Sequence, residues 1–181
     1  MKKIDISFGL AIVLILAAAA TRFLPHPPNF TAVGSLALFG GAYFSRKNLS
    51  WLIPFTTLFI SDIILNNLVY HIDFTWYSLG TYLAFGLVFL MGKLISSKIS
   101  VQRILLGSAA ASLVFFLVTN LFSWQYYPFY TKDMVGLIQC YVAALPFFWN
   151  TIAGDLTFSM VMFGIYYLSL KQFKLTEHRA I

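Results

Sequence analysis

Long apolar stretches follow one another along this chain, and only short polar segments separate them. Residues 49–69 and Ser78–Ile95 are apolar on every side of a helix, whereas a membrane β-barrel would show short strands of alternating apolar and polar residues. Each of these two stretches is long enough to cross about 30 Å of hydrocarbon as an α-helix. The pattern therefore predicts an all-α fold, a polytopic membrane helical bundle.

The same pattern predicts about six transmembrane helices. The first five helices are expected at residues 7–24, 31–44, 49–69, 76–95 and 101–122, and the second of them is short. Residues 134–170 are too long for a single untilted span, and Pro146 interrupts them. Because proline removes a hydrogen-bond donor from a helix, we expect residues 134–145 to form a broken or re-entrant segment before the sixth helix. Residues 1–181 are expected to form a single integral membrane domain.

The composition agrees with a membrane protein. Hydrophobic residues make up 60% and charged residues 10% of the 181 positions, and the mean hydropathy is +0.81. The surface of a soluble domain of this size would carry far more charged residues. The net charge of +6 comes from cations beside apolar spans and not from a basic groove with interleaved aromatic residues. Nucleic acid is therefore not expected as a partner.

The positions of the cations predict the orientation of the chain. With six spans, Arg22 and Lys132 fall on one side of the membrane, and all the other Lys and Arg residues fall on the opposite side. The positive-inside rule then predicts a multi-pass membrane protein with both termini in the cytoplasm. The first apolar run also resembles a signal peptide, but it is longer than a signal-peptide core, so we expect it to stay as a helix.

Three loops on the expected outer face are rich in aromatic residues, prolines and histidines. They comprise residues 25–30, 70–76 and 123–133, whereas the opposite loops at 45–50 and 96–102 contain no aromatic residue. One interpretation is an interfacial belt, because Trp and Tyr favour the depth of the lipid headgroups. Since the clustering is one-sided, the other interpretation is a lid of flat stacking surfaces over a binding site.

Polar residues within the spans suggest what that lid would cover. A carboxylate inside a membrane must be neutral, paired or hydrated, so Asp62 and Asp155 are candidates for function. Counted along ideal helices, both reach the outer half of the bilayer. Asn66 follows Asp62 by four residues and so is expected on the same helix face, and the other asparagines converge on the same region. We therefore predict a substrate-binding site made of Asn29, Asp62, Asn66, Asn120, Trp124, Asn150 and Asp155. The alternative is structural, with the aspartates capping broken helices or pairing with Arg22.

Other chemistry has little support in the sequence. Phosphate-binding loops, zinc-protease motifs and nucleophile elbows are absent, and we expect no catalytic residue, cofactor or metal. His26, His71 and Asp73 match no metal-ligand spacing. The single cysteine, Cys140, excludes an internal disulfide and is interpreted as a small apolar residue.

Several motifs stand out along the chain: RFLPHPPNFT at 22–31, LFGGAYF at 38–44, Ser61 with Asp62, Thr119 and Asn120 with Trp124, residues 136–148, and GDL at 154–156. They resemble those of a family of uncharacterised bacterial inner-membrane proteins, and the similarity covers most of the chain. The resemblance implies a location in the bacterial inner membrane. The chain length, the six-span topology and the outer loops also resemble the S components of energy-coupling-factor (ECF) vitamin transporters. This second resemblance implies outer loops that close over a vitamin, and a membrane coupling protein and an ATPase on other chains. It also makes Cys140 the positional analogue of a cobalt-ligating cysteine in solitary cobalamin-binding relatives.

These observations favour a small membrane transporter or an S-component-like, substrate-binding subunit that captures a vitamin-like small molecule from the outer side. Its expected partners are the small-molecule ligand and the lipid bilayer. One alternative is a membrane-embedded enzyme that uses Asp62, Asp155 and the outer histidines on a lipid-linked substrate. The other is a structural or assembly subunit that depends on the small-residue faces around Gly80 and Gly107.

Overall fold

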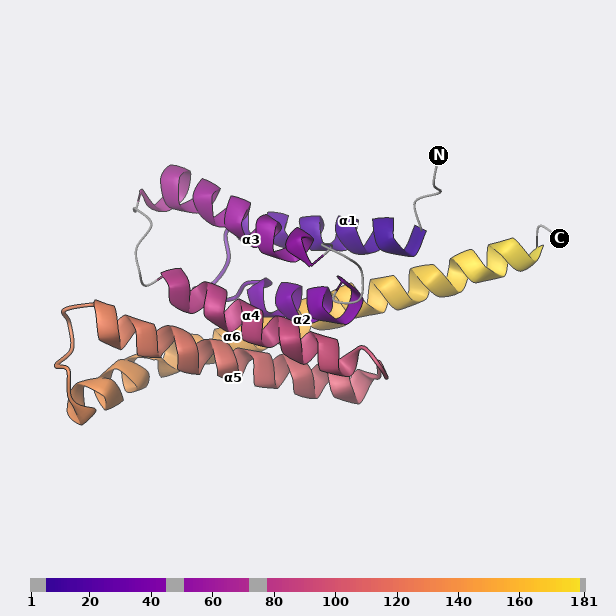
Figure 1. The fold of residues 1–181 in the computed structure, drawn as a ribbon. Coiled ribbons are helices and arrows are strands. Elements are labelled where there is room, and N and C mark those ends of the chain that lie inside the picture. Colours follow the sequence, from indigo (N-terminus) through magenta and orange to yellow (C-terminus); the bar gives the residue numbers. More distant parts are fainter. Residues whose placement is uncertain (1–5, 45–50, 72–77, 180–181) are drawn as a thin grey trace.

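The computed structural model describes residues 6–44, 51–71 and 78–179, with the side chains of Tyr70 and residues 173–179 left aside. A 3-10 turn, η1 (Thr21–Phe23), extends α1, and a π-helical segment, η2 (Leu65–Tyr70), extends α3. All regular elements in the described ranges are helical, which confirms the predicted all-α fold (Figure 1). The α-helices are α1 (Ile6–Ala20), α2 (Val33–Phe44), α3 (Leu52–Ile64), α4 (Ser78–Ile95), α5 (Val101–Tyr126) and α6 (Met134–Arg179).

Two of these helices are shorter than a membrane span. The segments α1 with η1 and α2 are apolar but short, and the 12 residues of α2 extend over only about 18 Å. Four other stretches have the length and composition predicted for membrane-spanning helices, and their outer surfaces expose large apolar side chains such as Leu106 and Leu168. The stretches that are long and apolar enough to cross a membrane are Leu52–Val69, Ser78–Ile95, Val101–Tyr126 and Met134–Gln172.

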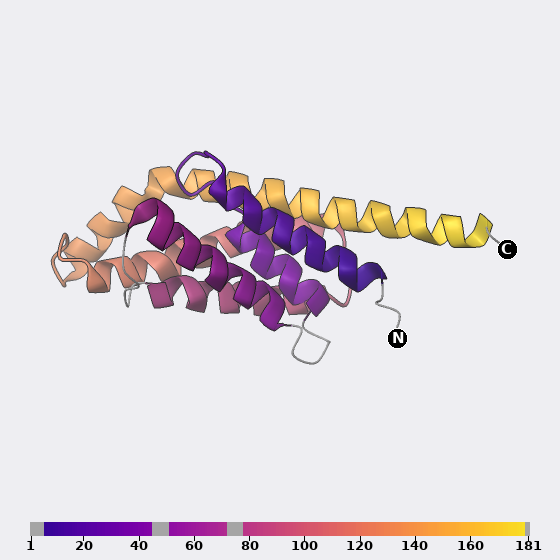
Figure 2. The ribbon, with the colours of Figure 1, turned by 90° about the horizontal axis from the view of Figure 1, so that it is seen from above.

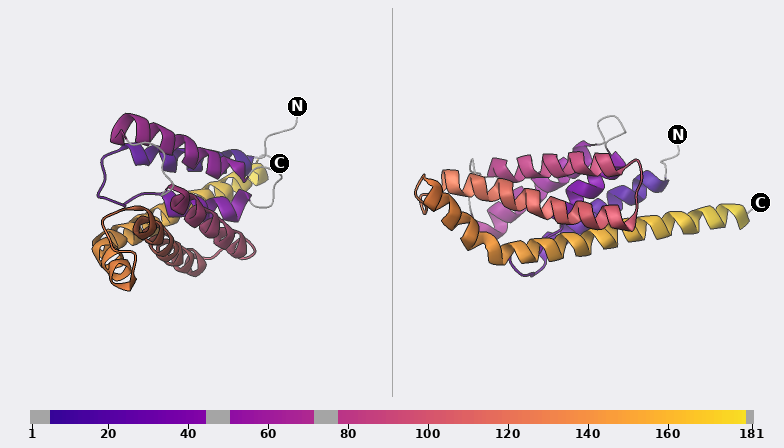
Figure 3. Two further views of the ribbon diagram at one scale, coloured as in Figure 1. Left: turned by 60° about the vertical axis from the view of Figure 1, so that its left-hand side comes forward. Right: turned by 90° about the horizontal axis from the view of Figure 1, so that it is seen from below.

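The short helix α2 lies in the middle of the bundle and contacts each of the other α-helices. α1 and α3 lie on one side of it, and α4, α5 and α6 lie on the other (Figures 1 and 3). Every residue of α2 except Tyr43 is buried. Because neighbouring helices cover α2 on all sides, its sequence needs no polar face. Gly41 and Gly92 bring α2 and α4 so close that an added Cβ on either glycine would collide with the backbone of the other helix.

The C-terminal helix differs from the sequence-based prediction. α6 runs without interruption from Met134 to Arg179, so the prediction of a separate broken or re-entrant segment at 134–145 is wrong. Pro146 lies inside α6, and the N-terminal part of the helix is inclined to the remainder (Figure 3, right). Proline removes only one backbone hydrogen bond, so a kinked helix leaves fewer unpaired groups in a membrane than a broken one. With 46 residues, or about 69 Å, α6 projects beyond the other helices (Figure 2).

The described cations separate between the two ends of the bundle. The start of α1, the α4–α5 connection and the C-terminal end of α6 lie at one end, and the α5–α6 connection lies at the other (Figure 1). Exposed Lys93, Lys98 and Arg103 belong to the first end, whereas Lys132 belongs to the second. This separation is the one that the positive-inside rule requires, and the assignment of the first end to the cytoplasm stays a prediction.

Candidate functional site

A cavity of about 690 Å³ lies at the N-terminal end of α2. Val33 and Gly34 line it from the start of α2, and the α1–α2 connection, η2, α4, α5 and α6 contribute the other lining residues. α2 has 12 residues, and the four helices of spanning length around it are longer. The bundle therefore continues beyond the N-terminus of α2, and the space left there is the cavity.

The cavity lining combines aromatic side chains with polar groups that are mostly uncharged. Phe115, Phe116, Phe147 and Phe148 provide apolar surface, as is typical of small-molecule sites. The cavity brings together four of the seven predicted site residues, which are Asn29, Asn66, Asn120 and Asp155. The lining also contains polar residues that the sequence analysis did not select for the site: Arg22, His26, Thr31, Thr81, Thr119 and Thr151.

Three of these polar side chains donate hydrogen bonds to their own helices. The hydroxyl groups of Thr119 and Thr151 and the amide nitrogen of Asn120 donate to backbone carbonyl oxygens one turn earlier, at 2.6, 3.1 and 2.8 Å. Each side-chain oxygen still has lone pairs that can accept a hydrogen bond. The part of the lining from α5 and α6 therefore presents mainly acceptors to a bound molecule.

Asp155 caps the start of α2 from a neighbouring helix. Asp155 is 1% exposed, and its Oδ1 accepts a hydrogen bond from the backbone N–H of Ser35 at 3.1 Å. Oδ2 accepts from the hydroxyl group of Ser112 at 2.7 Å, and the hydroxyl group of Ser35 donates to the backbone oxygen of Asp155 at 2.8 Å. The first N–H groups of a helix have no partner within the helix and favour an acidic group nearby. This geometry matches the structural alternative for Asp155.

Glycines allow α6 to approach the start of α2. A Cβ added to Gly34 would lie 2.6 Å from the Cγ of Asp155, which is too close for two carbon atoms. A Cβ added to Gly154 would lie 3.0 Å from the backbone nitrogen of Thr31. The GDL motif at 154–156 therefore combines a glycine for close approach with the aspartate that caps α2.

Asp62 forms an ion pair and does not line the cavity. The Nη2 of Arg22 lies 2.6 Å from the Oδ1 of Asp62, and the hydroxyl group of Tyr82 donates to Oδ2 at 2.9 Å. The Nη1 of Arg22 donates to the hydroxyl group of Ser61. This confirms the alternative in which Asp62 pairs with Arg22. The Nε–H of Arg22 is buried without a partner in the described structure, and Arg22 lines the cavity, so a bound molecule can supply the missing acceptor.

Asn66 lines the cavity although Asp62, four residues earlier, does not. The sequence analysis placed both on one face because it assumed regular α-helical spacing. The structure instead has the π-helical segment η2 from Leu65 onward. A π turn holds more residues than an α turn, so it changes the angle between side chains before and after it. Such turns are frequent at functional sites.

Asn150 and Trp124 stabilise connections between helices but do not line the cavity themselves. The side-chain nitrogen of Asn150 donates to the backbone oxygen of Pro28 at 2.9 Å and so holds the α1–α2 connection against α6. The Nε1–H of Trp124 donates to the backbone oxygen of Thr131 at 2.8 Å, and the Nζ of Lys132 lies 6.0 Å from the ring centroid of Trp124. Both contacts are within the chain, and neither residue lines the cavity.

Only the first of the three predicted outer loops contributes to the cavity within the described structure. His26, Pro28 and Asn29 line it, and Asn29 has a left-handed backbone with φ 62°, a conformation that asparagine tolerates. No residue of 123–133 lines the cavity. Residues 72–77, which include Asp73 and most of the second loop, lie outside the described residues. An aromatic lid from the third loop is therefore not formed over this cavity.

Cys140 is buried, and its Sγ lies 3.5 Å from the backbone oxygen of Asn120. It does not line the cavity, so the positional analogy with a cobalt-ligating cysteine has no support from this geometry. Across the described residues, His, Cys, Asp and Glu do not gather in groups of three that could hold a metal ion. The contact between Cys140 and Asn120 links α6 to α5.

The comparison with known families identifies the family of this chain. Residues 2–178 match the profile of DUF6580, a family of unknown function. The chain belongs to this family. The match agrees with the resemblance to an uncharacterised family and does not extend to the S components of ECF transporters. No curated protein and no solved structure matches the chain.

The polar residues that the sequence analysis missed had only weak signals. Arg22 stands out as a cation at the outer end of the first helix, but it was interpreted as a determinant of topology. Thr81 is a common residue in apolar helices, and nothing in its spacing links it to Asn66. Thr119 adjoins Asn120, but it was noted only as part of a motif shared with a family. Their convergence depends on how the helices pack around the end of α2.

Proposed function

We propose that this chain is a small membrane transporter or substrate-binding subunit that captures a vitamin-like molecule in the cavity at the N-terminal end of α2. The observation that carries this proposal is the polar lining of the cavity, to which segments from the whole length of the chain contribute. Unpaired polar groups inside a membrane cost free energy. Packing alone would therefore favour an apolar lining, and a bound molecule with matching groups explains the polar one.

The size and charge of the cavity indicate the kind of molecule. Its volume of about 690 Å³ lies within the range of about 300 to 1,000 Å³ that is usual for small-molecule sites. Arg22 is paired with Asp62, and Asp155 is engaged in capping α2, so the lining offers no unpaired charge of its own. We expect an uncharged or zwitterionic ligand whose donors face the threonine and asparagine oxygens, with an acceptor for the Nε–H of Arg22.

Capture from the outer side is part of this proposal. The α1–α2 connection lines the cavity and follows Arg22, which the positive-inside rule assigns to the outer face. The chain has no nucleotide-binding motif, so energy for transport would come from a coupling protein and an ATPase on other chains. Partners of this kind are also what the resemblance to S components implies.

The test compares two neighbouring asparagines. Asn66 lines the cavity, whereas Asn67 is exposed and donates to the backbone oxygen of Ile63 at 2.8 Å. Mass spectrometry of the gently solubilised protein identifies a co-purifying molecule, and titration calorimetry then measures its affinity. Because a lost hydrogen bond costs about 1 to 1.5 kcal/mol, Asn66→Ala should bind about tenfold more weakly and Asn67→Ala should bind normally.

Three results would contradict the proposal. The first is a purified protein that carries phospholipid but no other small molecule and binds none of a panel of vitamins. The second is equal affinity of Asn66→Ala and the wild type when both are folded, because the ligand would then lie elsewhere. Equal weakening by Asn66→Ala and Asn67→Ala would indicate a change in η2 as a whole and would also argue against direct contact.

A further inference from the structure

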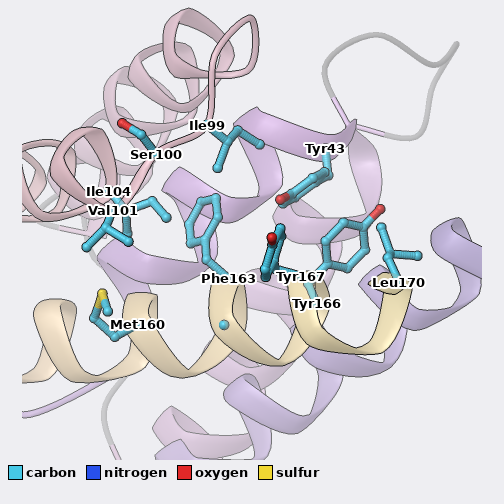
Figure 4. Close-up of a pocket in the computed structure, with 11 residues that line it drawn as sticks. Tyr43, Ile99, Ser100, Val101, Ile104, Met160, Phe163, Tyr166, Tyr167 and Leu170 are labelled. Carbon is cyan, nitrogen blue, oxygen red and sulfur yellow. The ribbon is translucent and has the colours of Figure 1, made fainter. Parts of the chain in front are cut away.

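A second hollow lies at the C-terminal end of α2 (Figure 4). It is a groove of about 580 Å³ between α2, the start of α5 and the C-terminal half of α6. Figure 4 shows side chains from the start of α5 on one side and side chains of α6 on the other. Most of the lining is apolar, as the side chains of Val101, Ile104, Met160 and Phe163 illustrate.

The groove is open to the outer surface of the helical bundle. Met160 is 40% exposed and Tyr167 is 65% exposed, although both line the groove. Gly164 lies between them on α6, and a Cβ added there would meet no atom within 4 Å. In a membrane, an open apolar groove of this kind faces the acyl chains of lipids.

Three cations lie close in the sequence to residues that line the groove. Lys98 precedes the lining residue Ile99, and Arg103 lies in the first turn of α5. Lys171 is four residues after Tyr167, so it continues the groove-lining stripe of α6 by one turn. All three cations are exposed.

No described carboxylate neutralises these cations. The acidic residues whose side chains the structure describes are engaged elsewhere: Asp62 binds Arg22, Asp155 caps α2, and Asp133 accepts from the backbone of Gly136. Among the described side chains, the end of the groove that is close to the chain termini therefore carries positive charge beside an apolar surface. This combination is complementary to an anionic lipid.

We propose that the groove binds one anionic phospholipid, with an acyl chain along α6 and the phosphate group at Lys98, Arg103 and Lys171. An acyl chain gains little free energy by moving from the bilayer to an apolar protein surface. Selectivity must therefore come from the headgroup, and clusters of Lys and Arg beside membrane helices attract anionic lipids. The site shares no lining residue with the polar cavity, so it does not depend on the function proposed for that cavity.

The first test fills the groove with a side chain. The protein is reconstituted in nanodiscs of equal parts phosphatidylglycerol and phosphatidylcholine, released, and analysed by native mass spectrometry. The wild type should retain one phosphatidylglycerol molecule, and Gly164→Leu should lower this retention about tenfold. Gly86→Leu is the matched control, because a Cβ added to Gly86 also meets no atom within 4 Å and Gly86 does not line the groove.

The second test removes the charges and leaves the helix packing unchanged. Replacing Lys98, Arg103 and Lys171 together with Gln should lower the preference for phosphatidylglycerol over phosphatidylcholine by about fivefold per cation. Lys93→Gln removes an exposed cation at the same end of the bundle, from α4, and should change the preference little. This control separates a defined site from general attraction to the positive surface.

Several results would overturn the proposal. Undiminished phosphatidylglycerol retention in folded Gly164→Leu, or equal loss in Gly86→Leu, would exclude the groove as the site. An unchanged lipid preference in the triple variant would exclude the three cations. An uncharged apolar molecule in place of phospholipid, or a dimer that dissociates only in Gly164→Leu, would assign the groove to a different occupant.

Discussion

The two ends of α2 are held in place by different kinds of contact. At the N-terminal end, Asp155 of α6 and Ser112 of α5 form hydrogen bonds around the first turn of α2. At the C-terminal end, Gly41 of α2 and Gly92 of α4 allow the two helix backbones to touch. The first arrangement requires polar groups deep in the bundle, whereas the second requires the absence of side chains. The adjoining hollows follow the same division, since one is polar and the other is apolar.

This difference helps to separate structural polar residues from functional ones. A helix that begins inside a membrane needs acceptors for its first N–H groups, and Asp155 supplies one. Asn29, Asn66 and Thr81 line the same cavity but take no part in the cap. Packing around α2 thus accounts for Asp155 but not for Asn29, Asn66 and Thr81, whose roles the proposed ligand would explain.

The largest effect is expected from Asp155→Ala. This change leaves the backbone N–H groups of Gly34 and Ser35 without their acceptor in the core, at about 2 kcal/mol each. The hydroxyl group of Ser112 can still donate to the backbone oxygen of Ser108 at 3.1 Å. We expect the free energy of unfolding to fall by about 4 kcal/mol in SDS-induced unfolding of the protein in mixed micelles. Asp155→Asn keeps one acceptor oxygen and should lose less. If Asp155→Ala is as stable as the wild type, hydrogen bonding to Asp155 does not hold the N-terminal end of α2 in place.

Asp62→Ala should have the next largest effect, because it leaves the guanidinium group of Arg22 largely buried without its carboxylate. The two side chains are 12% and 17% exposed, so we expect a loss of about 3 kcal/mol in the same assay. Replacing both Arg22 and Asp62 with Leu should recover part of that loss, since it removes the unpaired charge as well. A double variant less stable than Asp62→Ala would contradict this account of the ion pair.

A smaller effect is expected at the glycine contact between α2 and α4. Gly92→Ala adds a Cβ where the backbone of Leu38 leaves no room, and we expect a loss of about 2 kcal/mol. Gly86→Ala is the control on the same helix, because its Cβ would lie in open space. There the higher helix propensity of alanine should raise the stability by up to about 1 kcal/mol. A change of the same sign in both variants would rule out close packing as the role of Gly92.

Much of the fold could be predicted from local sequence patterns. Apolar stretches located the helices, and the short run before Phe44 gave the short second helix. The error at 134–145 arose because Pro146 was interpreted as a break, whereas the structure has a bend in a continuous helix. A single proline does not determine whether a helix breaks or bends. The outcome depends on whether neighbouring groups satisfy the backbone carbonyl that loses its N–H partner at the proline.

The candidate site was harder to predict because it depends on contacts between distant helices. Asn66 and Asn120 were found because amides stand out in apolar helices, and Asn29 was found in a connection expected on the outer face. Asp62 was placed on the same face as Asn66 because no sequence signal revealed the π turn of η2. Trp124 was selected for its ring, but its partners are within its own connection.

A contrasting, exposed cap lies at the start of α6. The Oδ1 of Asp133 accepts hydrogen bonds from the backbone N–H of Gly136 and the hydroxyl group of Thr131, each at 2.8 Å. The N–H of Gly136, followed by the hydroxyl group of Thr131, holds the pKa of Asp133 below its ordinary value of 3.8. Asp155 caps α2 in the core, whereas Asp133 caps α6 in a fully exposed position. Substitution of Asp133 should therefore have the smallest effect of the variants considered.

That small effect should depend on pH in a defined direction. Because the pKa of Asp133 is lower in the folded protein, its charged form stabilises the fold at pH values above the ordinary pKa, and this contribution is lost as the pH falls through the lowered pKa. The stability difference between the wild type and Asp133→Ala should thus be present near neutral pH and shrink below about pH 4. Asp133→Asn can cap the helix without titrating, so its difference from Asp133→Ala should change less with pH. If the wild type and Asp133→Ala differ equally at neutral and acidic pH, the charge of Asp133 does not stabilise the start of α6.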